Sequence, residues 1–132
     1  MNKAKRELIE DAIKSSDQHL KTAKFTLGIK SFNDSVSISY YALLDITRAV
    51  LIYAEIFPKS HSGTIHKFNE KFIKTEIFPK KFGRMLSEIE KDRIEADYNF
   101  KKRFTAEEAK EIFGNAQEFT TVVKKYLKEN IK

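Results

Sequence analysis

Arg93 and Asp97 stand out because they lie where a predicted helix over residues 80–98 should present apolar side chains to a core. The other positions of this inward stripe are apolar: Phe82, Met85, Leu86, Ile89, Ala96 and Phe100. Burying a charge is costly unless the group is paired, and residues four apart on a helix can reach each other. Two interpretations stay open. The pair locks the helix register, packing against Tyr41 and Asp45, or the guanidinium fork binds phosphate.

His61 is the second candidate for chemistry, and it lies between two serines in the polar stretch PKSHSG, which predicts a turn. An imidazole titrates near neutral pH, so this side chain can act as a general base. In the alternative interpretation its ring only hydrogen-bonds the turn. His66 and Glu70 have the spacing of two metal ligands on a helix, but two ligands without a third do not make a site. The sequence therefore predicts neither a metal nor a cofactor.

The charge balance favours an anionic partner. The chain has 25 Lys and Arg against 19 Asp and Glu, which gives a net charge of +6. The densest short basic run is Lys101, Lys102 and Arg103, directly after Asp97 and Tyr98. Such a field attracts RNA or an acidic protein surface without regard to sequence. The alternative is an ordinary lysine-rich surface, since lysines occur in most segments.

The elements that must position these residues are helices, and the longest apolar one is predicted over residues 31–57. It is apolar around most of its circumference, which is typical of a helix surrounded by partners. One polar strip remains along it: Asp34, Ser37, Tyr41, Asp45, Arg48 and Glu55. This strip must face solvent or a polar site, so Tyr41, Asp45 and Arg48 are candidate binding residues.

Four further helices are predicted around this central one. The first covers residues 3–27 with Gly28 as its stop signal, a short one covers 64–74, and the fourth covers 80–98. The last begins with a capping box formed by Thr105 and Glu108. The sequence therefore predicts an all-α fold, an antiparallel up-and-down bundle of four long helices plus one short helix. Residues 1–132 contain no linker or repeat, which indicates a single domain.

Composition excludes several other classes. Only 4 Gly and 2 Pro leave little material for the turns of an all-β fold, and the absence of Cys excludes disulfides and thiolate sites. The charged N-terminus is unlike a signal peptide, and no apolar run is judged long enough to span a membrane. We expect a cytoplasmic protein with no membrane partner.

The order of several segments resembles the small single-domain HEPN proteins. These segments are SISYYALLDITRAVL, KSHSGTIHKF, DRIEADYNF, a helix start at FTAEEA and the helix AQEFTTVV. The resemblance covers nearly the whole chain. It implies a five-helix HEPN bundle, commonly a homodimer, and often the companion of a minimal nucleotidyltransferase in a toxin–antitoxin pair. The resemblance also implies a catalytic motif: catalytic members of the superfamily are metal-independent RNases whose site is an Arg, then four to six residues, then a His.

This chain departs from that motif. Arg93 matches the arginine, but Asp97 and Tyr98 stand where the histidine region begins, and no other arginine has a histidine at the required spacing. The first interpretation is therefore a HEPN protein that binds a nucleotide, RNA or an acidic partner through Arg93, Asp97 and Tyr98. The second is an RNase in which His61 supplies the missing base. The third is an interaction module without catalysis. A histidine close to Arg93 in space would favour the second.

Overall fold

Helical segments form all the regular secondary structure in the computed structural model, which describes residues 1–131. In chain order they are α1 (Lys3–Gly28), α2 (Phe32–Tyr53), α3 (His61–Phe68), the π-helix η1 (Asn69–Ile73), α4 (Lys80–Tyr98) and α5 (Ala106–Asn130). Four are long and α3 with η1 is short. The predicted all-α bundle is confirmed.

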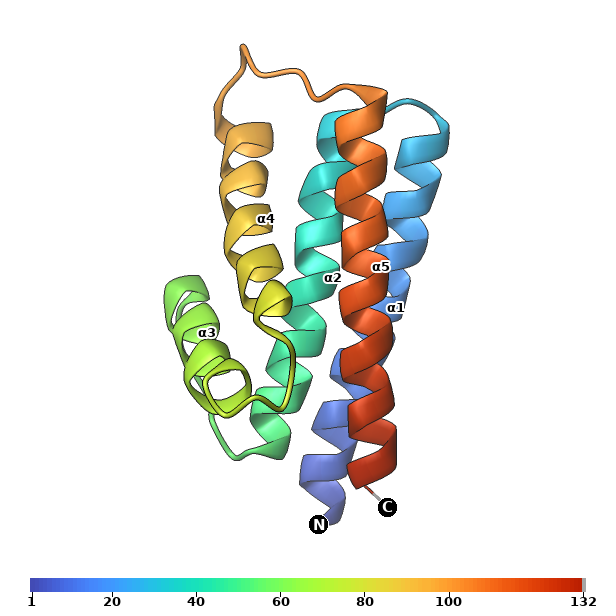
Figure 1. Cartoon of the computed structure of the whole chain (residues 1–132). Helices are drawn as coiled ribbons and strands as arrows, with labels where there is room; N and C mark the ends of the chain where they lie inside the picture. Colours follow the sequence, from blue (N-terminus) through green and yellow to red (C-terminus); the bar gives the residue numbers. More distant parts are fainter. Residues whose placement is uncertain (132) are drawn as a thin grey trace.

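α2 is the central helix, as predicted. It packs against α1, α3, α4 and α5, and its apolar side chains are almost completely buried. Figure 1 shows α1, α2 and α5 running side by side, with α4 and the shorter α3 on the other side of α2. Both chain ends lie at the same end of the bundle, and the loop from α4 to α5 crosses the opposite end (Figure 1). α3 therefore meets α4 well away from α1.

The prediction that the central helix extends to Phe57 was wrong. The backbone turns at Glu55, which adopts the left-handed region with φ of 62°. The N–H of Glu55 donates to Ile52 O, and that of Ile56 donates to Leu51 O, both at 2.9 Å. This pattern is a Schellman motif, which satisfies the last carbonyl groups and ends the helix. Phe57 consequently lies outside α2 and is exposed.

The end of α1 is built in the same way, and Gly28 does not have the predicted role. Gly28 belongs to the helix, and the left-handed residue is Lys30 with φ of 64°, after which Ser31 N–H donates to Thr26 O. Ser31 is the N-cap residue of α2, but its hydroxyl donates to Asp34 Oδ2 at 2.6 Å instead of accepting from the backbone. At α5, by contrast, the predicted capping box is present in full.

α3 begins at His61, three residues before the start predicted for the short helix. Ser60 is its N-cap, and the Ser60 hydroxyl accepts from the N–H of Gly63 at 2.9 Å. This bond satisfies one of the free donors of the first turn. The second half of the stretch predicted as a polar turn, from His61 on, is therefore helical. The side chain of His61 is therefore positioned by a helix end and not by a flexible loop.

Aromatic side chains hold α3 and η1 against α4 and α5. Phe68 lies with its ring centroid 5.5 Å from that of Phe119, and Phe82 lies 5.4 Å from Phe119. Phe72 and Phe78 pack on the same cluster. Aromatic pairs at these separations add stability beyond the area they bury. This cluster fixes the angle at which α3 approaches α4.

α2 is also long and apolar enough, by length and composition alone, to cross a membrane, which the sequence analysis did not recognise. Its most apolar window has a mean hydropathy of 1.3, and 72% of that window is buried within the bundle. Burial of this extent is what a core helix requires. The bundle itself therefore accounts for the apolar character of α2.

Candidate functional site

Arg93 lies on the face of α4 that packs against α2, and only 8% of its surface is exposed. Its guanidinium carbon lies 4.9 Å from the ring centroid of Tyr40, on α2. One terminal nitrogen, Nη2, lies 3.3 Å from His61 Nδ1, and the other, Nη1, lies 3.8 Å from Asp97 Oδ2. The Nε of Arg93 is buried and has no hydrogen-bond partner within residues 1–131. This cation is buried with donors left over, which an exclusively structural pair would avoid.

His61 faces Arg93 from the first turn of α3. A guanidinium can only donate, so His61 Nδ1 is the acceptor and carries the lone pair, which places the hydrogen of the neutral ring on Nε2. Burial lowers the pKa of His61 below its usual value, and the positive charges of Arg93 and Arg48 lower the pKa further. The imidazole is therefore neutral at neutral pH, in the form that accepts a proton.

Tyr40 completes the site, and the sequence analysis did not include it. Its ring lies 5.6 Å from that of His61, so the same ring contacts both His61 and Arg93. Burial raises the pKa of Tyr40 to about 12, with a further contribution from the charge of Glu90, so the phenol stays protonated. A tyrosine on the buried face of a helix looks like an ordinary core residue. The feature that could have identified Tyr40 in the sequence is its hydroxyl, because packing alone at this position of α2 requires only an apolar side chain.

Asp97 is held in place by α2. The hydroxyl of Ser37 donates to Asp97 Oδ1, while Asp97 Oδ2 faces Arg93. The predicted pairing of Arg93 with Asp97 is therefore present, but at 3.8 Å it is a long contact. The Asp97 carboxylate is hydrogen-bonded to Ser37 on α2 and, at this distance from Arg93, only partly neutralises the guanidinium. Positive charge remains available for an anion beside His61.

The structure does not bring the other predicted residues of α2 and α4 to Arg93. Asp45 accepts hydrogen bonds from Ser15 at 2.6 Å and from His19 at 2.7 Å, both on α1. Tyr41 packs beside the ring of His19. The hypothesis that Arg93 is locked against Tyr41 and Asp45 is therefore wrong, because that part of the polar strip faces α1.

Tyr98 and Arg48 lie at the edge of the site. Tyr98 follows Asp97 in sequence, yet 69% of its surface is exposed, and no hydrogen bond joins it to Arg93 within residues 1–131. Arg48 is exposed on α2 and acts on His61 through its charge. Neither residue is part of the cluster formed by the buried Arg93 and Tyr40 with the half-buried His61 and Asp97.

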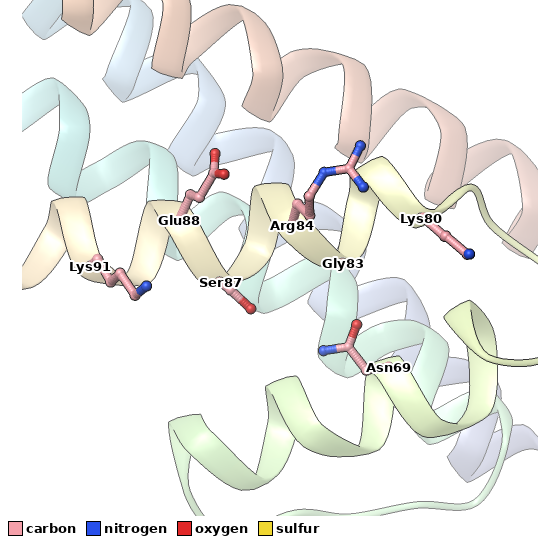
Figure 2. Close-up of a pocket in the computed structure, with 7 residues that line it drawn as sticks. All are labelled: Asn69, Lys80, Gly83, Arg84, Ser87, Glu88 and Lys91. Carbon is pink, nitrogen blue, oxygen red and sulfur yellow. The ribbon is translucent and has the colours of Figure 1, made fainter.

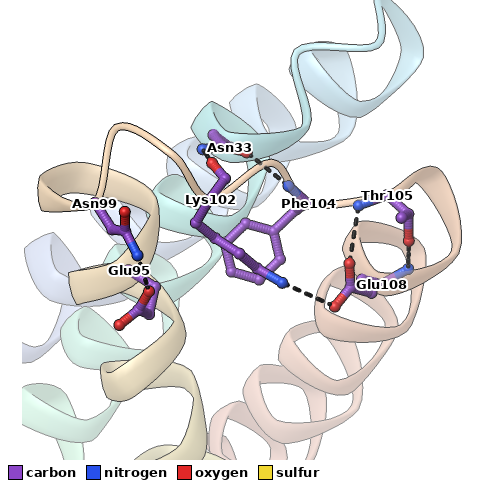
Figure 3. Close-up of polar contacts among 7 residues, drawn as sticks. All are labelled: Asn33, Glu95, Asn99, Lys102, Phe104, Thr105 and Glu108. Carbon is purple, nitrogen blue, oxygen red and sulfur yellow. Dashed lines mark hydrogen bonds and ion pairs between the residues drawn. The ribbon is translucent and has the colours of Figure 1, made fainter.

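The basic loop contributes most of its polar groups to local contacts (Figure 3). Lys102 Nζ lies 3.3 Å from Glu108 Oε2 and over the ring of Phe104. Arg103 donates to the carbonyl oxygens of Phe100 and Lys102, at 2.6 and 3.1 Å. Lys101 remains exposed. The loop is thus internally bonded, and its role in binding RNA stays a prediction.

No group of three His, Cys, Asp or Glu side chains that could hold a metal ion occurs among residues 1–131. His66 Nε2 lies 3.5 Å from Glu70 Oε2, as their spacing predicted, and a third ligand does not join them in this part of the chain. The chemical groups that the site itself supplies are a buried guanidinium, a neutral imidazole beside it and a protonated phenol beneath both. Together they can bind a phosphate and move one proton.

Comparison with known proteins identifies the relatives of this chain. The HEPN domain profile matches residues 9–126. A protein of Methanocaldococcus jannaschii named "Putative toxin MJ0605" is 33% identical over 129 residues, which cover 98% of this chain and 96% of the relative. "Putative toxin MJ0142" of the same organism is 31% identical, covering 93% and 83%. A UPF0332 protein of Thermotoga maritima is 26% identical and covers 95% of each chain.

Proposed function

The chain belongs to the HEPN domain family. From this premise and from its likeness to proteins named as toxins, we propose that it is a toxin-type HEPN protein that cleaves RNA without a metal, using Arg93 and His61. The observation that carries the proposal is the 3.3 Å approach of His61 Nδ1 to Arg93 Nη2, from residues 32 apart in the chain. It supplies a histidine beside the arginine although the sequence lacks the usual Arg-x4–6-His motif.

The proposed reaction is an internal transfer at a phosphodiester. His61 Nδ1 accepts the proton of a ribose 2′-hydroxyl, whose oxygen attacks the adjacent phosphorus. The bond to the 5′-oxygen breaks, and that oxygen takes the proton back from His61. The products are a 2′,3′-cyclic phosphate and a 5′-hydroxyl. Arg93 stabilises the negative charge that builds on the phosphoryl oxygens in the transition state.

The geometry also explains how substrate would prepare the base. Without an anion, a proton on His61 is disfavoured because Arg93 and Arg48 are close, and the pKa of His61 is low. A phosphate bound to the guanidinium neutralises it and so raises the affinity of His61 for a proton. The phosphate takes the place of His61 on Arg93 Nη2, which leaves His61 Nδ1 free to accept a proton. Proton transfer is thereby coupled to phosphate binding.

Burial of Arg93 favours a second candidate, binding without cleavage. Because only 8% of Arg93 is exposed, a ligand reaches it only when the first turn of α3 moves aside. A nucleotide, an RNA end or an acidic partner held there would need the guanidinium but not a proton acceptor. In this form the protein is the binding subunit of a toxin–antitoxin pair.

The partner and the assembly are proposals that rest on the family. We propose a homodimer and pairing with a minimal nucleotidyltransferase. Sedimentation of the purified protein at tens of micromolar tests the first, and a monomer contradicts it. Purification of the chain co-expressed with the adjacent nucleotidyltransferase, where the genome encodes one, tests the second.

Cleavage of a labelled RNA in the presence of EDTA tests the proposed function. We expect Arg93→Gln to lower the rate by about 100-fold or more, as loss of a transition-state donor does. His61→Gln should lower it by a factor of about 10²–10⁴, the range for general base catalysis. Arg6→Gln on α1 and His66→Gln on α3 are the matched controls and should cleave like the wild type.

Two outcomes contradict the cleavage proposal. Full activity of the Arg93 and His61 variants would place catalysis elsewhere. A wild-type protein that does not cleave RNA, but binds a labelled nucleotide or RNA with an affinity that depends on Arg93 and not on His61, would support the second candidate. Circular dichroism of each variant separates loss of activity from loss of fold.

A further inference from the structure

A groove of about 500 Å³ runs along the outer side of α4, separate from the Arg93 cluster. Its lining comes from α4 and from Asn69 of η1: Asn69, Lys80, Gly83, Arg84, Ser87, Glu88 and Lys91. Figure 2 shows Asn69 reaching from η1 toward α4, with the other side chains following α4 on either side of that contact. The groove holds three cations and one carboxylate, so its net charge is positive.

The cations form a regular stripe. Lys80, Arg84 and Lys91 share one face of α4 because they recur at intervals of four and seven residues, and Ser87 lies between them on the same face. They extend over about 16 Å of helix, at 1.5 Å per residue. Lys81, the neighbour of Lys80, pairs with Glu118 at 2.8 Å, whereas the three stripe cations have no ion pair within residues 1–131. Their charge is therefore free for a ligand.

The walls of the groove are fixed by close packing of η1 on α4. A Cβ at position 83 would overlap Asn69 Oδ1 and press on Ile73, so glycine lets the Asn69 side chain lie directly against α4. Asn69 is the first residue of the π-helix, and its amide nitrogen donates to Ile65 O at 3.0 Å. A π-helical turn is often found at functional sites. The hydroxyl of Ser87 lies beside the cations and can donate to an anion, whereas the amide oxygen of Asn69, an acceptor, faces Gly83.

We propose that this groove binds the phosphodiester backbone of an RNA strand and holds it for the Arg93 site. The inference rests on the proposed RNA cleavage for the identity of the ligand. A row of unpaired cations along a groove complements a chain of regularly spaced anions. The same two segments build both sites, since η1 meets α4 at Gly83 and α3 meets α4 at Arg93. A strand bound in the groove therefore lies beside Asn69, and the continuous segment of α3 and η1 leads from there back to His61.

The test compares two triple variants that lower the net charge equally. The groove variant is Lys80→Gln, Arg84→Gln and Lys91→Gln, and the control is Lys14→Gln, Lys21→Gln and Lys24→Gln on α1, which does not pack against α4. All six residues are exposed, so both variants should fold. Both are made in a His61→Gln background, which keeps the RNA intact and leaves Arg93 in place.

Binding of a short fluorescein-labelled oligouridylate is followed by anisotropy over a range of salt concentrations. Three lost phosphate contacts should reduce the slope of log affinity against log salt by about 2, since each contact to a single strand contributes about 0.7. At low salt the groove variant should bind at least about tenfold more weakly. The control should keep the slope and affinity of the parent.

An equal loss in both variants would show that only net charge matters and would overturn the groove. Unchanged RNA binding by the groove variant would also overturn it, and a selective loss of polyglutamate binding would then assign the groove to an acidic protein. Because affinity is measured without cleavage, this result is independent of the cleavage assay. Failure of Arg93→Gln to abolish cleavage would reject the proposed function while leaving the groove in place.

Discussion

The Arg93 site and the loop between α4 and α5 are both rich in charged side chains. They differ in how completely the polar groups have hydrogen-bond partners. In the loop, Asn33 of α2 donates to Lys102 O and accepts from Phe104 N–H, each at 3.0 Å (Figure 3). At the site, Arg93 has an unpartnered Nε and an ion pair of 3.8 Å. The polar groups of the loop therefore hold it in place, whereas the guanidinium at the site keeps an N–H donor without a partner.

This difference teaches that the density of charge in a sequence does not locate a site. Lys102 and Arg103 lie in a basic run of the sequence, but their charged groups mostly form contacts within the loop. Hydrogen bonds from Thr105 N–H and from Lys102 lower the pKa of Glu108 there. Arg93, hidden in an apolar stripe, is a buried cation that still has a donor without a partner. Stability and function should therefore respond in opposite ways to substitution in the two regions.

The largest effect on stability is expected at the loop. Phe104 is 6% exposed and packs with Val36 and Ala109. Phe104→Ala should lower the free energy of unfolding by about 3–5 kcal/mol, as truncation of a buried aromatic does. Chemical denaturation measures this. Phe100→Ala in the same loop, where 85% of the side chain is exposed, is the control and should change stability by no more than about 0.5 kcal/mol.

A smaller loss is expected for Asn33→Ala. The change removes two hydrogen bonds and leaves Phe104 N–H and Lys102 O without their partner. An unsatisfied buried group costs about 1–3 kcal/mol, so the unfolding free energy should fall by that amount. RNA binding at the groove on α4 should stay the same. A stability equal to that of the wild type would mean that water replaces the amide and that the loop is not held by Asn33.

At the site the expected change in stability is smaller still. Arg93→Leu removes a buried cation whose ion pair with Asp97 is long, and the carboxylate left behind is part-exposed and keeps its hydrogen bond from Ser37, so the loss should be on the scale of an exposed pair. We expect the unfolding free energy to change by about 1 kcal/mol or less, while RNA cleavage is lost. A loss of about 3–5 kcal/mol would instead show that Arg93 and Asp97 lock the fold.

The finest test is the titration of His61. Its pKa is lowered first by burial and then by Arg93, so Arg93→Gln should move it up toward the usual value, as measured by NMR of the ring protons. Because the folded pKa is depressed, His61 contributes stability above about pH 6.5, and this contribution is lost as pH falls through the folded pKa. The Arg93 variant should lose less stability on acidification. His66, which does not contact Arg93, is the internal control. An unmoved His61 would show that the guanidinium does not act on it.

Local signals in the sequence determined most of the fold. Apolar periodicity placed α2 at the centre and located α4 and α5, because each helix needs an apolar face of period 3.6 to pack. The capping box of Thr105 and Glu108 was predicted correctly, since its bonds form between residues three apart. The end of α1 was predicted to within one residue, but the end of α2 was missed because Glu55 adopts left-handed backbone where sequence preference favours glycine.

The sequence also singled out Arg93, Asp97 and His61 by their types and positions. Only the tertiary structure decided that His61 meets Arg93, because the contact joins residues 32 apart and depends on the start of α3 at Ser60 and its packing against α4. The same packing placed Tyr40 beneath both side chains and turned Asp45 toward α1. A periodic pattern specifies which face of a helix is buried, whereas the identity of the side chain it meets is set by how the helices assemble.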